Sequence, residues 1–203
     1  MRPGGGADGI LMREVSVSRP AVFLDRDGVI NENQDGDYVR HWQGFRFLPG
    51  AVAAIAALHA AGYPVVVVTN QAGIARGRLS AATLEEIHTR MLANIRAGGG
   101  DVMAVLHCPH HPEEGCDCRK PQPGMLRRAA AQLGLDLSRS VLVGDHLTDM
   151  QAALTAGCRA ILVRTGRGSS VCDEVAADPS FAEVDVVDDL PAAVATILAE
   201  SRL

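Results

Sequence analysis

Two aspartates separated by a single residue, Asp25 and Asp27, follow the short apolar run of residues 21–24. In an extended backbone, alternate side chains point to the same side, about 6 to 7 Å apart, so both carboxylates can face one site. A third carboxylate, that of Asp145, ends another apolar run. Clustered carboxylate oxygens, completed by water and substrate phosphate, are the ligands that Mg²⁺ prefers. A cation among them would keep Asp25 ionised despite its neighbours, and an ionised aspartate can accept a phosphoryl group covalently.

A second group of metal-binding residue types lies between residues 107 and 118, where three cysteines and three histidines are crowded together. Three thiolates and one imidazole form a closed tetrahedral zinc site of the structural kind, with no position left open for catalysis. The spacing leaves His107, His110 and His111 as candidates for the imidazole. An odd total of five cysteines does not suggest a disulfide framework, and a reducing compartment favours zinc over a disulfide or a pair of reactive thiols. The predicted thiolate ligands are Cys108, Cys116 and Cys118.

The order of apolar segments predicts the elements that position these residues. Short β-branched runs alternate with Ala- and Leu-rich stretches of helical spacing, which is typical of the α/β class with a doubly wound, mostly parallel sheet of the Rossmann type. Strands are predicted over 21–25, 64–69, 102–108, 140–145 and 160–165. Helices are predicted over 50–62, 80–100, 124–134, 148–157 and 190–201, with Ser80 as an N-cap and Gly62 as a C′ glycine. Residues 166–185 are expected to be irregular.

Polar residues follow four of the predicted strands. Thr69 and Asn70 come after four valines, the cysteine-rich loop leads into Lys120, and Asp149 lies four residues beyond Asp145. In open parallel sheets, ligands bind beyond the carboxyl ends of the strands. An isolated pair of aspartates is as often a solvated strand end as a site. Four polar strand ends on one rim favour a site.

Length and composition favour a single enzyme-sized domain. With 203 residues, we expect a flexible leading segment over residues 1–20 and one domain over 21–203, without an insertion large enough for a cap domain. The net charge of -5 and 3% aromatic residues argue against a nucleic-acid partner. No apolar run approaches the roughly 20 residues that a membrane helix needs. The Gly-rich start lacks the apolar segment of a secretory signal, so we expect a cytoplasmic location. We also expect a monomer and no membrane partner.

Four motifs stand in a fixed order: DRDGVIN at 25–31, Thr69 with Asn70, Lys120, and Gly144 with Asp145. In this order they resemble the signature of the haloacid dehalogenase-like phosphohydrolases. The resemblance implies Asp25 as nucleophile, Asp27 as general acid/base and Thr69 as the residue that orients the phosphoryl oxygens. It also implies Lys120 as charge stabiliser, and Asp25, Asp27 and Asp145 as the Mg²⁺ ligands. The second aspartate is typical of members that act on phosphate, because a leaving alkoxide needs a proton.

Two subfamilies resemble this chain in both the DRDG start and the zinc loop. One hydrolyses a heptose 1,7-bisphosphate and the other hydrolyses histidinol phosphate. Residues 70–77, 118–126 and 163–166 are more similar to the heptose subfamily, which implies a small sugar phosphate as substrate. Ala72 in place of the usual serine, and the short gap before Cys116, depart from that pattern and leave histidinol phosphate as the alternative.

The same likeness implies individual binding residues. It points to His110 as the imidazole ligand of zinc, and to Asn70, Gln71 and Arg119 as substrate-binding residues. Arg119 is the leading candidate for a second phosphate, because the planar guanidinium matches that anion. Two further arginines, Arg76 and Arg164, are either helpers or solvated surface charges.

Two other classes of protein use parts of this pattern. A non-enzymatic zinc module could bind protein or nucleic acid, although the acidic charge offers it little basic surface. A receiver domain phosphorylated on aspartate also places an acidic cluster at a sheet edge. A receiver has no aspartate two residues after the phosphorylated one, so Asp27 favours turnover over switching.

Overall fold

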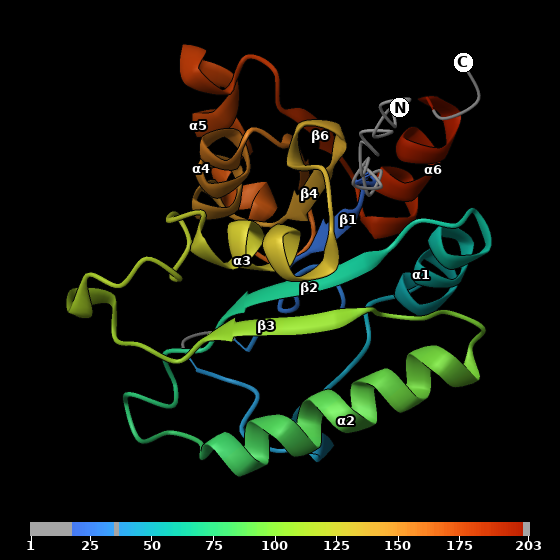
Figure 1. Cartoon of the computed structure of the whole chain (residues 1–203). Helices are drawn as coiled ribbons and strands as arrows, with labels where there is room; N and C mark the ends of the chain where they lie inside the picture. The colour runs from blue at the N-terminus through green and yellow to red at the C-terminus, as the bar shows by residue number, and fades with distance from the viewer. Residues whose placement is uncertain (1–17, 35–36, 201–203) are drawn as a thin grey trace, which may run out of the picture.

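The structure, a computed structural model, describes residues 18–34 and 37–200. A parallel sheet of six strands, in the order β3-β2-β1-β4-β5-β6, runs through the centre (Figure 1). The strands are β1 Val22–Leu24, β2 Val65–Asn70, β3 Ala104–Cys108, β4 Val141–Gly144, β5 Arg159–Val163 and β6 Asp185–Val187. The α-helices are α1 Ala51–Ala60, α2 Ala81–Ala97, α3 Gly124–Leu133, α4 Leu147–Ala156, α5 Gly168–Ala177 and α6 Leu190–Glu200. Short 3-10 turns lie at Trp42–Gly44, Pro112–Glu114, Leu137–Arg139 and Pro179–Phe181.

Alternating strand residues feed two separate apolar cores. Val22 and Leu24 of β1 pack with α1, α2 and α6 on one face, whereas Phe23 packs with α3, α4 and α5 on the other. Every described residue of β1 and β4 is buried, as expected for central parallel strands covered on both faces. The helices therefore cover both faces of the sheet, which confirms the doubly wound α/β prediction (Figure 1).

The direction of winding reverses between β1 and β4, which are hydrogen-bonded neighbours. Such a switch point opens a crevice beyond the carboxyl ends of the two strands. Asp25 follows the end of β1 and Asp145 follows the end of β4. The fold thus brings together two aspartates that are far apart in the sequence.

The five predicted strands and five predicted helices all occur, within a few residues of the expected bounds. Ser80 caps α2 by accepting a hydrogen bond from the backbone N of Thr83 at 3.0 Å. Gly62 adopts φ +82 just after α1, the left-handed conformation expected at a C′ position. Between β1 and β2 the described residues form only a short 3-10 turn and α1, so no cap domain is inserted there.

The prediction that residues 166–185 are irregular is wrong. This stretch contains α5 and a 3-10 turn, and it leads into the edge strand β6, which the sequence analysis also missed. Its glycines, serines and aspartates are poor helix formers, which hid the helical pattern. The helix forms because Val171 and Val175, one turn apart, bury against the second core together with Phe181.

The predicted leading segment lies almost wholly outside the described residues. At its described end, the backbone N of Arg19 donates to the carbonyl of Gly134 at 3.3 Å, and its carbonyl accepts from the backbone N of Asp136 at 3.0 Å. The division into residues 1–20 and 21–203 stays a prediction. Among the described helices, none is both long and apolar enough to cross a membrane.

Candidate active site

A cavity of about 490 Å³ opens where β1, β2 and β4 end. Its floor includes Asp25, Asp27 and Thr69. Its walls come from the loop after β1, from the cysteine-rich loop after β3 and from the start of α4. The predicted polar rim therefore lines one hollow, covered by short loops.

Lys120 is the centre of a buried ionic network. Its Nζ lies 3.0 Å from Asp25 Oδ1 and 2.6 Å from Asp149 Oδ1, and it donates to the carbonyl of Val68 at 2.8 Å. These three partners satisfy all three ammonium donors. Although burial opposes it, the charges of Asp149 and Asp25 raise the pKa of Lys120, so the side chain is a permanent cation.

Asp25, Asp145 and Asp149 bring carboxylate oxygens within 4.8 Å of one another. Three carboxylates facing one ammonium leave two negative charges without a balancing cation, which is the charge of one divalent ion. Asp25 Oδ1 is occupied by Lys120 and by the backbone N of Arg26 at 2.7 Å. Among the described residues nothing donates to Asp25 Oδ2 or to Asp145 Oδ1, so these two oxygens are available to a cation. Hard oxygen donors of this kind fit Mg²⁺.

The pKa values of this cluster reflect the crowding of negative charge. Burial, reinforced by Asp149 and Asp145 and opposed by Lys120, raises the pKa of Asp25 to about 8. Burial and Asp149 likewise raise the pKa of Asp145 to about 6. Without an added cation, Asp25 therefore holds a proton at neutral pH, whereas Asp145 is mostly ionised there. Carboxylates perturbed in this way inside a cavity are typical of catalytic sites.

The second oxygen of Asp145 is held in place by its surroundings. Oδ2 accepts from Asn33 Nδ2 at 2.8 Å and from the backbone N of Arg167 at 2.9 Å. A Cβ on Gly28 would lie 2.0 Å from this oxygen, and a Cβ on Gly166 would lie 2.2 Å from it. Only glycine fits at both positions, and φ at each is positive. These contacts leave Oδ1 facing the cluster.

Asp27 lies on the cavity floor but outside the group of three carboxylates. Arg26 Nη2 donates to both of its oxygens at 2.9 Å, Asn31 Nδ2 donates to Oδ1 at 2.9 Å, and Gln71 Nε2 donates to Oδ2 at 2.8 Å. Burial alone would raise its pKa, but Arg26 and these hydrogen bonds outweigh burial and lower the pKa of Asp27. The group of three carboxylates thus contains Asp149, which was not predicted as a ligand, and the role of Asp27 as a magnesium ligand stays a prediction.

Thr69 and its neighbours divide their contacts between the cavity and the interior. Thr69 lines the cavity, and its Oγ1 accepts from Gln71 Nε2 at 2.9 Å. Gln71 is fully buried, so the structure places it behind Thr69 and Asp27 and away from the cavity where a substrate contact was predicted. Asn70 lines the cavity too, but both ends of its amide bind the Lys120 peptide, Oδ1 accepting from N at 3.1 Å and Nδ2 donating to O at 3.0 Å.

Arg119 also lines the cavity. Its Nη1 is buried and has no hydrogen-bond partner among the described residues. An unsatisfied buried donor is unfavourable, so the guanidinium of Arg119 has hydrogen-bonding capacity that the described residues do not use. Arg76 and Arg164 are exposed and do not line the cavity.

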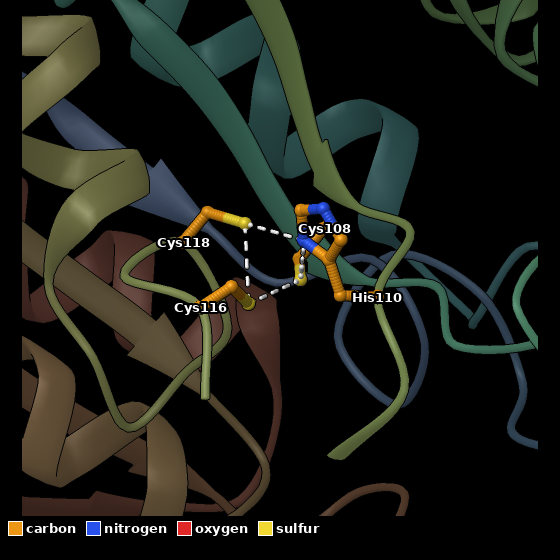
Figure 2. A group of neighbouring side chains, drawn as sticks. All are labelled: Cys108, His110, Cys116 and Cys118. Carbon is orange, nitrogen blue, oxygen red and sulfur yellow. Dashed lines mark hydrogen bonds between the residues drawn. The ribbon is translucent and has the colours of Figure 1, made fainter. Parts of the chain in front are cut away.

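The cysteine-rich loop forms a compact cluster next to the cavity. Figure 2 shows three sulfurs and one imidazole nitrogen converging on a common point. The separations are 3.6 Å for Cys108–Cys116, 3.5 Å for Cys118–Cys116, 3.5 Å for Cys108–His110 and 3.2 Å for His110–Cys118, with His110 using Nδ1. A tetrahedral zinc with Zn–S bonds of about 2.3 Å has S···S edges of about 3.8 Å and S···N edges of about 3.6 Å. The cluster therefore fits zinc.

The thiol pKa values and the other histidines agree with this arrangement. Burial raises the pKa of Cys108 to about 12, whereas hydrogen bonds, acting against burial, lower the pKa of Cys116 to about 7. Thiols so close together need a cation to ionise as a group. His111 instead accepts from the backbone N of Glu113, and the ring of His107 lies 5.9 Å from that of His88.

Sequence reasoning missed three residues that organise the site. Asp149 was noticed only for its spacing from Asp145, and that spacing of four residues on a helix start was the available signal. His88 and Asn33 carry no local signal, because their partners lie 62 and 112 residues away along the chain.

Comparison with known proteins places this geometry in a family. The haloacid dehalogenase-like hydrolase family matches residues 28–154, and a second HAD-hydrolase-like family matches residues 117–193. The chain belongs to the haloacid dehalogenase-like hydrolases, and it is a phosphoric monoester hydrolase.

Several curated relatives and one solved structure resemble the chain over most of its length. The D-glycero-beta-D-manno-heptose-1,7-bisphosphate 7-phosphatase of Pseudomonas aeruginosa is 41% identical over 182 residues, covering 90% of this chain and 99% of that protein. The enzyme of the same name from Escherichia coli K12 is 43% identical over 169 residues, covering 79% of this chain and 87% of its own. The D,D-heptose 1,7-bisphosphate phosphatase of Bordetella bronchiseptica, solved with magnesium and phosphate, superposes with a TM-score of 0.84 at 42% identity, covering 89% and 99%.

Proposed function

We propose that this protein removes the 7-phosphate of D-glycero-D-manno-heptose 1,7-bisphosphate, in the synthesis of nucleotide-activated heptose precursors. The name shared by its relatives supports the substrate. The observation that carries the chemistry is the buried Asp25–Lys120–Asp149 network beside Asp27 on one cavity floor. This arrangement pairs a nucleophile with a fixed cation and a separate proton carrier.

In the first half of the reaction, Asp25 Oδ2 attacks the phosphorus of the 7-phosphate. The bond from phosphorus to the sugar oxygen breaks, and that oxygen takes a proton from Asp27. Because its contacts lower the pKa of Asp27, this half of the reaction uses the fraction of molecules in which Asp27 has first taken up a proton from solvent. Positioned acids of this kind contribute about 10²- to 10⁴-fold to rate. Lys120, held against Asp25, contributes fixed positive charge near the phosphoryl oxygens, and the Thr69 hydroxyl can donate to one of them. Charge and hydrogen bonds of this kind stabilise the transition state.

In the second half, a water molecule attacks the aspartyl phosphate. Asp27, left ionised by the first half, accepts the proton of that water, and inorganic phosphate leaves with Asp25 regenerated. The contacts from Arg26, Asn31 and Gln71 favour the ionised form that this step requires.

Both metals are proposed from their donor sets. Magnesium would be held by Asp25 and Asp145, in the cluster that Asp149 completes, with Asp27 as a further predicted ligand. When bound, Mg²⁺ supplies the positive charge that keeps Asp25 ionised and balances the phosphoryl oxygens. Zinc would be held by the four residues of Figure 2 and would fix the backbone leading into Arg119 and Lys120. Thiols that must stay reduced support a cytoplasmic location, and we expect a monomer.

A bisphosphate needs a second anion site, and Arg119 supplies it. Arg119 lines the cavity on the wall formed by the cysteine-rich loop, and its buried Nη1 has no hydrogen-bond partner among the described residues. We expect this guanidinium to bind the 1-phosphate while the 7-phosphate lies over Asp25. Asn70 contributes indirectly, by holding the Lys120 peptide.

The test compares bisphosphate with monophosphate. Phosphate release with Mg²⁺ should be fastest for heptose 1,7-bisphosphate among a panel that includes histidinol phosphate and a heptose 7-monophosphate. Arg119→Met should raise KM about tenfold or more for the bisphosphate and leave the monophosphate unchanged, since a charge-assisted hydrogen bond is worth about 1.5–3 kcal/mol. Arg76→Met, at an exposed arginine away from the cavity, is the control. A preference for histidinol phosphate would refute the proposed substrate.

A further inference from the structure

Arg26 is a charged side chain with no exposure to solvent. Burying an unpaired charge is strongly unfavourable, so its contacts must compensate fully. Nε and Nη2 donate to Asp27, and Nη1 contacts His88 Nε2 at 3.1 Å. All three nitrogens are therefore used, two of them on the same carboxylate.

This geometry fixes the plane of the Asp27 carboxylate. A guanidinium that binds both oxygens of a carboxylate restricts its rotation, which a lysine ammonium cannot do. The Asp27 side chain is 27% exposed on the cavity floor, whereas the Arg26 side chain is 0% exposed. Arg26 cannot touch a substrate, so any effect that it has on the reaction passes through Asp27.

His88 fixes Arg26 from the other side. It lies on α2, in the buried stripe that packs against the sheet. Because a guanidinium has only donors, His88 Nε2 must accept, which places the ring proton on Nδ1 and leaves the ring neutral. Burial and the adjacent Arg26 charge lower the pKa of His88 to about 3, with a smaller effect of His107, so the ring stays an acceptor at neutral pH.

We propose that Arg26 and His88 are positioning residues for Asp27: His88 anchors the guanidinium, and the guanidinium holds the carboxylate where it meets the departing sugar oxygen. Without His88, Nη1 would be buried without an acceptor, and Arg26 would turn toward another partner. This inference rests on the proposed role of Asp27 as proton donor. It assigns a function to His88, which lies on the buried face of α2 and would otherwise be interpreted as a core residue.

The test uses the leaving group. An alkyl phosphate needs a proton on its departing oxygen, whereas p-nitrophenyl phosphate releases a stable anion without one. The value of kcat/KM covers the steps through leaving-group departure, so it isolates this proton transfer. His88→Phe should lower kcat/KM about tenfold or more for heptose 1,7-bisphosphate and for a hexose 6-phosphate, and by about twofold or less for p-nitrophenyl phosphate.

Three further variants complete the design. His88→Gln, whose amide oxygen can accept from Arg26, should recover most of the loss. His107→Phe, beside His88 but without a hydrogen bond to Arg26 among the described residues, should leave the substrate ratio unchanged. Arg26→Lys keeps the positive charge but cannot bind both oxygens of Asp27, so it should also lower kcat/KM for alkyl phosphates more than for p-nitrophenyl phosphate. This variant tests the proposal if His88→Phe does not fold.

Equal losses on alkyl and aryl phosphates, or no loss at all, would overturn the proposal. Failure of the wild-type enzyme on the heptose alone would instead refute the proposed substrate. The ratio of hexose phosphate to aryl phosphate would still decide the role of His88.

Discussion

Binding of Mg²⁺ to the metal-free protein should release a proton. Burial and the neighbouring carboxylates raise the pKa of Asp25 to about 8, so at pH 7 about nine-tenths of the molecules carry a proton there. Asp145, with a pKa of about 6, adds about a tenth of a proton. Because only ionised carboxylates bind the cation, each ion should displace about one proton at pH 7 and about a tenth of a proton at pH 9.

Isothermal titration calorimetry measures this number directly. The observed binding enthalpy, measured at one pH in buffers with different ionisation enthalpies, changes in proportion to the protons released. The affinity for Mg²⁺ should rise about fivefold from pH 7 to pH 8 and change little above pH 9. Asp25→Asn removes the titrating group, so its proton release at pH 7 should fall to about a tenth. Binding that is independent of buffer at pH 7 in the wild type, or equal release in the variant, would refute this reasoning.

Three other outcomes follow from the same site. In the presence of chelator, the raised pKa of Asp25 contributes stability that is fully present below about pH 4 and is lost as the pH rises through about 8. The urea midpoint of the metal-free wild type should therefore fall between pH 5 and pH 8 relative to that of Asp25→Asn. Saturating Mg²⁺ should remove this dependence of the midpoint on pH. Gly28→Ala should abolish Mg²⁺ binding, because the added Cβ would lie 2.0 Å from Asp145 Oδ2. Gly62→Ala is the control, because Gly62 also has a positive φ but an added Cβ would have no atom within 4 Å. It should lower the free energy of unfolding in urea by only about 1 kcal/mol and bind Mg²⁺ normally. Lys120→Met should lower the free energy of unfolding by about 3–5 kcal/mol in the same assay, since it strips the cation from a buried ionic network, and an unchanged midpoint would contradict the buried ion pairs.

The sequence predicted the parts of the fold that depend on local pattern. Three patterns each predicted a structure from a few neighbouring residues: the valine run of β2, the Ser80 cap and the spacing of the cysteines. In contrast, α5 depends on two valines meeting the second core, and β6 is a three-residue strand defined by pairing with β5. Tertiary contacts of this kind cannot be predicted from the helix and strand propensities of the residues.

The same division holds for the site. The order of motifs placed Asp25, Lys120 and Asp145 correctly around one cavity. The orientation of side chains could not be predicted, because Gln71 faces inward to Asp27 only when β2 ends beside β1. Which carboxylate joins the cluster is likewise decided by hydrogen bonds that span long stretches of chain.

The Lys120 peptide is gripped on both sides by the amide of Asn70, at the end of a central strand. Lys120 is therefore anchored to the sheet as well as to the cysteine-rich segment that precedes it. Pro112 and Gly115, which form part of the outer wall, lie on that segment between two of the cysteines. An engineer can therefore vary residues 112–115 to reshape this part of the wall, while the amide of Asn70 keeps Lys120 in register.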